Sequence, residues 1–160
     1  MPNLAIAALG HKVTIGTFYD ARTDNFLPEC LFKSGLPAEA IQRTTRNNVS
    51  VIYNGGSTYQ KQIESMGVGA SQSASILAGM VNCRGSGRFL SAIQRPRSAQ
   101  GALHHAIHTC TEKLNTHDPT LRGFLTTDTI RNSRVTHIVA EIEWGARSIV
   151  TARLPISSLE

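Results

Sequence analysis

Polar and apolar side chains alternate more regularly in residues 136–154 than anywhere else in the chain. The even positions read Thr, Ile, Ala, Ile, Trp, Ala, Ser, Val, Ala, Leu, and the odd positions from 137 read His, Val, Glu, Glu, Gly, Arg, Ile, Thr, Arg. Because successive side chains point to opposite faces of a strand, this pattern predicts one long amphipathic strand with Trp144 on its apolar face. Such a strand is about three times the usual length, and Gly145 is expected to mark a bend or bulge in it.

A weaker alternation runs through residues 66–82, where one set of positions is mostly apolar and the other is small and polar. It predicts a strand, although a helix with an Ala/Ser stripe also fits part of the segment. Further strands are expected at residues 48–53 and 103–114, and one or two at 4–19 with a break at Gly10. A turn is expected near residues 23–25.

Helical signals are fewer. Residues 119–133 fit a helix with Asp118 as its cap and Pro119 at its first position. A short helix is expected from Pro37, with Ser34 as a cap upstream, inside an otherwise irregular segment of residues 26–48. Asn-Gly-Gly at residues 54–56 is a strong turn signal. Residues 84–101 are interpreted as helical or mobile.

Composition supports a β-rich domain. The chain has 160 residues, of which 41% are hydrophobic and 17% charged, enough for one domain with a core. Its three cysteines, Cys30, Cys83 and Cys110, have no CxxC spacing, which argues against a disulfide scaffold. The longest apolar run, LAIAAL, is too short to span a bilayer as a helix. The flank MPN lacks a basic residue, so we expect cytoplasmic synthesis without a signal peptide, followed by release or membrane association.

The net charge of +5 raises the question of an anionic partner. Much of the excess lies in the segment RGSGRFLSAIQRPR, which contains no acidic residue. Only Phe89 in it is suited to stack on a base, and no nucleic-acid-binding motif surrounds it, so nucleic acid is not the expected partner. A solvated surface and a lipid-headgroup contact remain the two interpretations. The candidate lipid-contact residues are Arg84, Arg88, Phe89, Arg95 and Arg97.

Two groups of side chains are candidates for a chemical site. His104, His108, Cys110 and Glu112 would share one face of a strand, but i and i+4 positions of a strand are about 13 Å apart, too far for one metal ion. In a helix His104 and His108 would approach each other. His137 and Glu141 are a conceivable catalytic pair, although a hydrogen-bonded structural histidine is the simpler interpretation. No GxSxG, HExxH or phosphate-loop pattern occurs, and we expect no enzyme activity, cofactor or metal.

Three strings of the chain resemble a known family when taken in order. LGHKVTIGTFYDAR, followed by DNFLPE, is similar to the start of the stonustoxin and verrucotoxin family. SASILAGMVNCRGSGRFL resembles the small-residue segment of that family, and THIVAEIEWGA resembles its Thr-His signature, with Val135 where glycine is usual. The residues that carry the resemblance are Leu9, Gly10, Tyr19, Asp20, Ala21, Arg22, Thr136, His137, Trp144 and Gly145.

The N-terminal domain of this family belongs to the membrane-attack-complex/perforin and cholesterol-dependent cytolysin superfamily. The resemblance implies an α+β fold, with a long bent antiparallel sheet flanked by helical clusters that become membrane-spanning hairpins after oligomerisation. The first such cluster would lie near residues 84–101. The family domain continues into a second cluster and a fourth strand, so residues 1–160 are interpreted as a single domain, the N-terminal part of the family domain, lacking its last strand and second helical cluster.

Two functions follow as hypotheses. The first is a stonustoxin-like pore-forming-superfamily domain that acts by self-association and membrane or lipid contact, without catalysis. The second is a non-lytic interaction module that uses an exposed sheet edge to bind a partner chain in homo- or hetero-oligomers.

Overall fold

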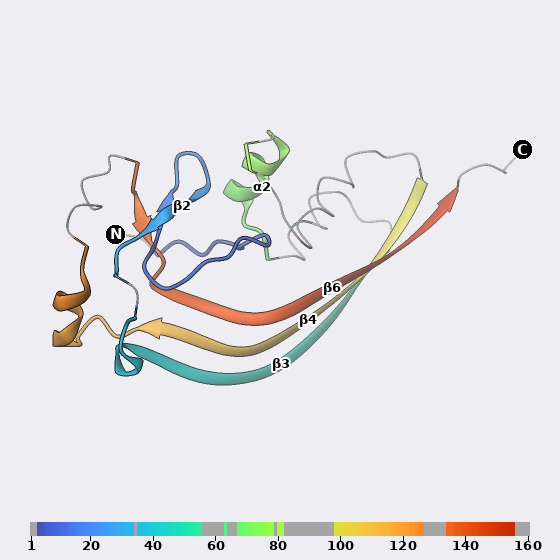
Figure 1. Cartoon of the computed structure of the whole chain (residues 1–160). Helices are drawn as coiled ribbons and strands as arrows, with labels where there is room; N and C mark the ends of the chain where they lie inside the picture. Colours follow the sequence, from blue (N-terminus) through green and yellow to red (C-terminus); the bar gives the residue numbers. More distant parts are fainter. Residues whose placement is uncertain are drawn as a thin grey trace, which may run out of the picture. The chain divides into compact units, whose positions relative to one another are not determined.

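Strands dominate the computed structural model (Figure 1). It describes residues 3–33, 35–55, 63, 67–78, 80–81, 98–126 and 134–155. The strands are β1 (Thr17–Asp20), β2 (Asn25–Cys30), β3 (Ile41–Gly55), β4 (Ser98–Leu114), β5 (His137–Ile138) and β6 (Glu141–Pro155). The helical elements are the 3-10 turns η1 (Ala38–Ala40) and η3 (Pro119–Phe124) and the helix α2 (Ala70–Leu77).

The strands of the described residues form two sheets, each of three strands. One has the order β2-β1-β5, and the other has the order β3-β4-β6. Strand β1 pairs antiparallel with both of its neighbours, and the long strands β3, β4 and β6 alternate in direction (Figure 1). Antiparallel sheets with short helices confirm the expected α+β class.

The long ribbon predicted for residues 136–154 is confirmed for most of its length, since β6 has 15 residues. Its start is different. The backbone N–H of Val139 donates to Thr17 of β1 at 2.9 Å, whereas the carbonyl of Ala140 accepts from Leu114 of β4 at 2.8 Å. The chain therefore passes from one sheet to the other between these two residues, and His137–Ile138 is a separate strand.

Regular alternation in β6 breaks just before Gly145. Glu143 Oε2 lies 3.7 Å from His108 Nδ1, and Trp144 Nε1 donates to Glu112 Oε2 at 2.7 Å. His108 and Glu112 share one face of β4, so the consecutive side chains of Glu143 and Trp144 both reach that face. A regular strand does not allow this, and the arrangement is that of a β-bulge. The irregularity expected at Gly145 is thus found one position earlier.

Three strand and loop predictions are wrong. Residues 4–16 contain no strand, and β1 begins only at Thr17. Residues 26–48 are not irregular, because they contain β2, η1 and the first half of β3. Residues 54 and 55 continue β3 instead of turning.

The predicted strand over residues 66–82 is also wrong, because its centre is the helix α2. Gln72, Ser75 and Ile76 are buried there, a spacing of three and four residues that matches a helical face. The side chain of Gln72 accepts from Ala7 N at 3.1 Å and donates to Ala7 O at 2.9 Å, which ties the helix to the N-terminal segment. Small residues fit a strand and a helix alike, and burial decides between them.

The helical caps are confirmed only in part. The Asp118 carboxylate accepts from Thr120 Oγ1 at 2.7 Å and, as expected for a cap, from Thr120 N at 2.8 Å, and these two bonds hold the pKa of Asp118 below its usual range. The element that it caps is a 3-10 turn ending at Phe124. Pro37 caps η1 without a side-chain bond. Ser34 and residues 82–97 and 127–133 lie outside the described residues.

The chain divides into two compact units, each made of several segments. The first unit comprises residues 1–11, 49–107 and 146–160, and the second comprises residues 12–48 and 108–145. The core of the first unit contains Leu9, Ile63, Val68 and Ile76, with Ile149 packed against it.

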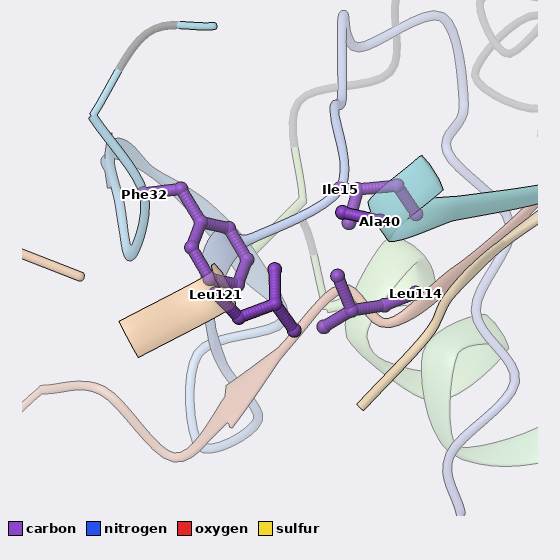
Figure 2. Packing of buried hydrophobic residues seen from close by; sticks show 5 residues of the cluster. All are labelled: Ile15, Phe32, Ala40, Leu114 and Leu121. Atoms are coloured by element: carbon purple, nitrogen blue, oxygen red, sulfur yellow. The ribbon is translucent and has the colours of Figure 1, made fainter. Parts of the chain in front are cut away.

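The second unit has its own core, whose side chains converge in Figure 2. Its buried members are Ile15, Phe32, Ala40, Leu114 and Leu121. Ile15 precedes β1 and Phe32 follows β2, whereas Ala40 lies in η1, Leu114 at the end of β4 and Leu121 in η3. The core therefore joins segments that are far apart in the sequence.

Candidate functional site

The two family strings that lie farthest apart in the sequence meet in the second unit. Tyr19 of β1 is the register partner of His137 of β5, and Phe18 is that of Ile138. We call this meeting point the motif corner; it consists of Tyr19, Asp20, Ala21, Arg22, Asp24, Thr136 and His137. The resemblance named most of these residues without indicating that they touch.

Thr136 is the hydrogen-bonding centre of the motif corner. Its Oγ1 accepts from Ala21 N at 2.8 Å and donates to Tyr19 O at 2.9 Å. The hydroxyl has one hydrogen, so His137 Nδ1, 3.0 Å from the same oxygen, must be the donor in that contact. Thr136 thus fixes both the end of β1 and the ring of His137.

Tyr19 fills the interior of the motif corner with a 3% exposed side chain. Its ring centroid lies 5.1 Å from that of Phe26 and 6.4 Å from that of His137. Its hydroxyl donates to Asp24 Oδ1 at 2.5 Å. Burial, followed by the bond to Asp24, raises the pKa of Tyr19 far above its usual value. The phenol therefore stays protonated and serves as a donor.

Asp20 and Arg22 form an ion pair at the outer side of the motif corner. Arg22 Nε donates to Asp20 Oδ1 at 2.9 Å, and Arg22 N donates to the same oxygen at 3.0 Å. The side-chain bond to Arg22 holds the pKa of Asp20 below its usual range. The polar groups of the motif corner thus form hydrogen bonds with the backbone and with one another. This is the arrangement of residues that stabilise a fold.

The remaining family residues lie elsewhere. Leu9 and Gly10 form a turn with φ of 49° and 81°, and Leu9 lies in the core of the first unit. Trp144, expected in the core, is 42% exposed on β6. The reason is the break in alternation at Glu143 and Trp144, which gives the indole a polar partner in Glu112.

The histidine and cysteine candidates lie along a strand, as one of the two interpretations expected. On β4, His104 and Cys110 are buried, whereas His108 lies 3.7 Å from Glu143. Within the part of the chain that the structure describes, no three His, Cys, Asp or Glu residues are grouped to hold a metal ion. A shallow cavity of about 540 Å³ beside η3 is lined by His117, Asp118 and Arg122 among others.

The proposed catalytic pair has other contacts. His137 bonds Thr136 in the motif corner, whereas Glu141 Oε2 lies 3.5 Å from Lys113 Nζ on β4. The candidate lipid-contact residues from Arg84 to Arg97 lie outside the described residues. No helix in the described ranges is both long and apolar enough to cross a membrane.

Sequence reasoning expected an exposed sheet edge, but it did not indicate which strands form the edges or that their apolar side chains are exposed. Among the strands that the structure describes, the order β3-β4-β6 leaves β3 and β6 at the two edges of this sheet. Val49, Val51 and Tyr53 of β3 are 59%, 60% and 71% exposed, and Val150 of β6 is 63% exposed. The uncharged run VSVIY at residues 49–53 was read as a strand, but its apolar side chains gave no signal that they face solvent.

The comparisons with known proteins agree on one family. The family model described as "SNTX, MACPF/CDC-like domain" matches residues 3–156. The chain is 26% identical over 147 residues to stonustoxin subunit beta of Synanceia horrida, and 25% identical over 147 residues to cytolytic toxin-beta of Scorpaena plumieri. Each alignment covers 91% of this chain and 21% of the relative, so the chain spans about one fifth of their length.

A solved structure shows that the fold is shared as well. The stonustoxin structure superposes with a TM-score of 0.63 at 19% identity, over 92% of this chain and 18% of that one. The fold is therefore that of a part of the stonustoxin-like domain, as the ordered motifs implied. The chain belongs to the SNTX, MACPF/CDC-like domain family, within the superfamily of pore-forming proteins.

Proposed function

We propose that this chain acts by self-association through the edges of its long sheet and by contact with membrane lipid, without catalysis. The observation that carries the proposal is the pair of edge strands, β3 and β6, in a sheet whose edge residues are exposed. Strand edges present unpaired backbone groups that readily accept another strand.

The first-unit part of β3 is the strongest candidate for such a contact. Its residues 49–53, VSVIY, contain no charge or proline, and Val49, Val51 and Tyr53 are more than half exposed. Charged side chains and proline are the usual means of blocking an edge strand. An edge without them favours association with another chain.

Charge provides a second argument, from the second unit. Arg43 and Arg46 lie on β3, whereas Glu141 and Glu143 lie on β6. The Arg43 side chain is 68% exposed, and those of Glu141 and Glu143 are 48% and 59% exposed. Opposite charges on the two edges favour contact between β3 of one copy and β6 of another.

Lipid contact is supported by the sequence and by the relatives. The basic run that contains Arg84, Arg88, Arg95 and Arg97 suits an anionic headgroup, each cation near the surface contributing about 1 kcal/mol. One relative is named a cytolytic toxin. The absence of catalysis is supported by the motif corner, where the polar groups of Tyr19 and Thr136 bond other protein groups.

Flotation with vesicles tests the lipid contact. The chain should float with phosphatidylserine-containing vesicles at low salt and remain at the bottom with phosphatidylcholine alone. Arg84→Gln, Arg88→Gln, Arg95→Gln and Arg97→Gln together should reduce the floated fraction at least tenfold. A matched variant removes four exposed cations of the second unit and should float as the parent does: Lys12→Gln, Lys33→Gln, Arg122→Gln and Arg134→Gln. Equal flotation of the two variants would refute a contact through the basic run.

The second candidate function is a non-lytic module that binds a partner chain through the same edges. Stonustoxin and neoverrucotoxin relatives are named as subunits, which favours assembly with a partner chain. This function predicts dimers or heteromers whose mass by light scattering is unchanged by vesicles. Assembly that increases on vesicles favours the first function, and lipid-independent assembly favours the second.

A further inference from the structure

A cavity in the second unit is used neither by the motif corner nor by the sheet edges. It lies beside η3 and has a volume of about 540 Å³, and we call it the η3 cavity. Small-molecule sites in proteins usually have volumes of about 300–1,000 Å³. All the residues that line the η3 cavity belong to the second unit, so its walls come from one compact part of the chain. Its size suits a small molecule.

The inner wall of the η3 cavity is apolar. Phe32 and Leu121 line it, and both are buried members of the core of the second unit, where Figure 2 shows them side by side. Leu125 also lines the cavity and packs against the same core. Contact with these side chains removes apolar surface of a ligand from water, which favours binding. The wall therefore suits the apolar part of a ligand.

Backbone pairing holds this wall in place. Phe32 follows β2 and Leu125 follows η3, and the two residues form an isolated β-bridge. Beside the bridge, Thr126 N donates to Leu31 O at 2.8 Å. Ligand sites are usually largely preformed, because a site that must first be ordered binds more weakly. The bridge therefore fixes the apolar wall before a ligand enters.

The rim of the η3 cavity carries two basic side chains, His117 and Arg122, and both are exposed. Within the part of the chain that the structure describes, neither side chain forms a hydrogen bond or an ion pair. Asp118 also lines the cavity, but its Oδ1 already accepts from Thr120 N and Thr120 Oγ1. The donors on Arg122 and His117 are therefore available to a ligand.

The donors of the rim fit an acid group. The guanidinium of Arg122 presents its N–H groups as a planar fork that matches the two oxygens of a carboxylate. The imidazole of His117 keeps at least one N–H donor in either protonation state. A ligand with a carboxylate at one end and an apolar chain at the other satisfies the rim and the inner wall together.

We propose that the η3 cavity binds an amphipathic carboxylate taken from solution, such as a monomeric fatty acid. Its acid group binds Arg122, with His117 as a second donor, and its apolar chain lies against Phe32, Leu121 and Leu125. This site is separate from the bilayer contact proposed for the basic run, because it needs no membrane and the loss of Arg122 leaves that run intact.

Calorimetric titration of the full chain without vesicles tests the site, with decanoate as the probe at concentrations where it is monomeric. The parent should bind decanoate saturably at one site. Decanol, which has the same chain without the acid group, should bind at least tenfold more weakly. Arg122→Gln should weaken decanoate binding at least tenfold, the effect of losing hydrogen bonds to a charged group, and should leave decanol binding unchanged.

Lys33→Gln is the matched control, because Lys33 is an exposed cation that directly follows Phe32 but does not line the cavity. It should bind decanoate as the parent does. A parent that binds no decanoate saturably would overturn the proposal. Equal affinities of Arg122→Gln and Lys33→Gln would overturn it as well, because binding would then not depend on the rim.

A second measurement needs no variant. In an NMR titration of the parent with decanoate, the imidazole signals of His117 and the methyl signals of Leu125 should shift together and saturate at the same concentration. The imidazole of His108, which lies on β4 opposite Glu143 and outside the cavity lining, should stay unshifted. Shifts at His108 as large as those at His117 would contradict a site in the η3 cavity.

Discussion

Thr136 Oγ1 accepts a hydrogen bond from the backbone N–H of Ala21 at 2.8 Å, although 115 residues separate the two positions. The same hydroxyl donates to Tyr19 O at 2.9 Å. One side chain therefore joins the start of β5 to the end of β1. This explains physically why a Tyr-Asp-Ala-Arg string and a Thr-His string occur together: each completes the hydrogen bonds of the other.

Thr136→Val should destabilise the chain, because it keeps the shape and removes all three hydrogen bonds of the hydroxyl, to Ala21 N, Tyr19 O and His137 Nδ1. The expected loss in the free energy of unfolding is about 1–3 kcal/mol, measured by urea denaturation. Thr136→Ser keeps the hydroxyl, and its loss in the free energy of unfolding should be clearly smaller. Equal losses for Val and Ser would show that the hydroxyl contributes nothing to the motif corner.

Tyr19→Phe should change the dependence of stability on alkaline pH. The pKa of Tyr19 is raised by burial and by Asp24, so the folded chain keeps the phenolic proton while the unfolded chain loses it above about pH 10. Folded Tyr19 thus binds more protons, and stability falls as the pH rises from there. Urea titrations between pH 8.5 and 10.5 should show that the free energy of unfolding falls less steeply with pH in Tyr19→Phe than in the parent. An identical slope in parent and variant would contradict the buried, protonated phenol.

Gly16→Ala should be among the most damaging single substitutions in the second unit. Gly16 has φ of +88°, and a Cβ there would lie 2.4 Å from Phe32 Cδ2 in the core. Backbone strain of about 1–3 kcal/mol is then added to overpacking of about 1–3 kcal/mol.

Gly35→Ala is the matched control, because Gly35 has a φ of +92° but nothing within 4 Å of the added Cβ. Its loss in the free energy of unfolding should come from backbone strain alone. Thermal and urea unfolding of both variants measure the difference, and Gly16→Ala should be the less stable by the overpacking term. If the two variants lose equally, the close packing of Phe32 on Gly16 is not a feature of the folded chain.

Val51→Lys should weaken self-association without unfolding the chain. Val51 is 60% exposed in the uncharged run of β3, so a lysine there is hydrated in the monomer. In an edge contact its charge would be buried, which disfavours association. Ala74→Lys, exposed on the helix α2 and outside both edge strands, is the control for added charge. Sedimentation velocity over a concentration series should show at least a tenfold weaker association for Val51→Lys only.

Regular side-chain patterns predicted the fold best. Residues 136–154 alternate with bulky and charged side chains, and most of that segment is β6. Asp118 was identified as a cap because its chemistry is local. The strand prediction for residues 66–82 is wrong because alanine, serine and glycine fit a strand face and a helix face equally well. Only the packing of Ile76 with Ile63 and Val68 selects the helix α2.

The candidate site could be predicted only as a set of residues. The family strings named Tyr19, Thr136 and His137, but their contact depends on the pairing of β1 with β5, which no local pattern encodes. Trp144 was placed in the core because strict alternation was assumed, and the break at Glu143 exposes it.

The central claim is that open sheet edges assemble copies of this chain on an anionic membrane. The most direct measurement is the number of chains joined by a short cross-linker on phosphatidylserine-containing vesicles, resolved by mass. Assembly through open edges predicts a ladder beyond the dimer for the parent and for Ala74→Lys, and monomers for Val51→Lys. Monomers alone in the parent, with or without vesicles and over a concentration series, would contradict it.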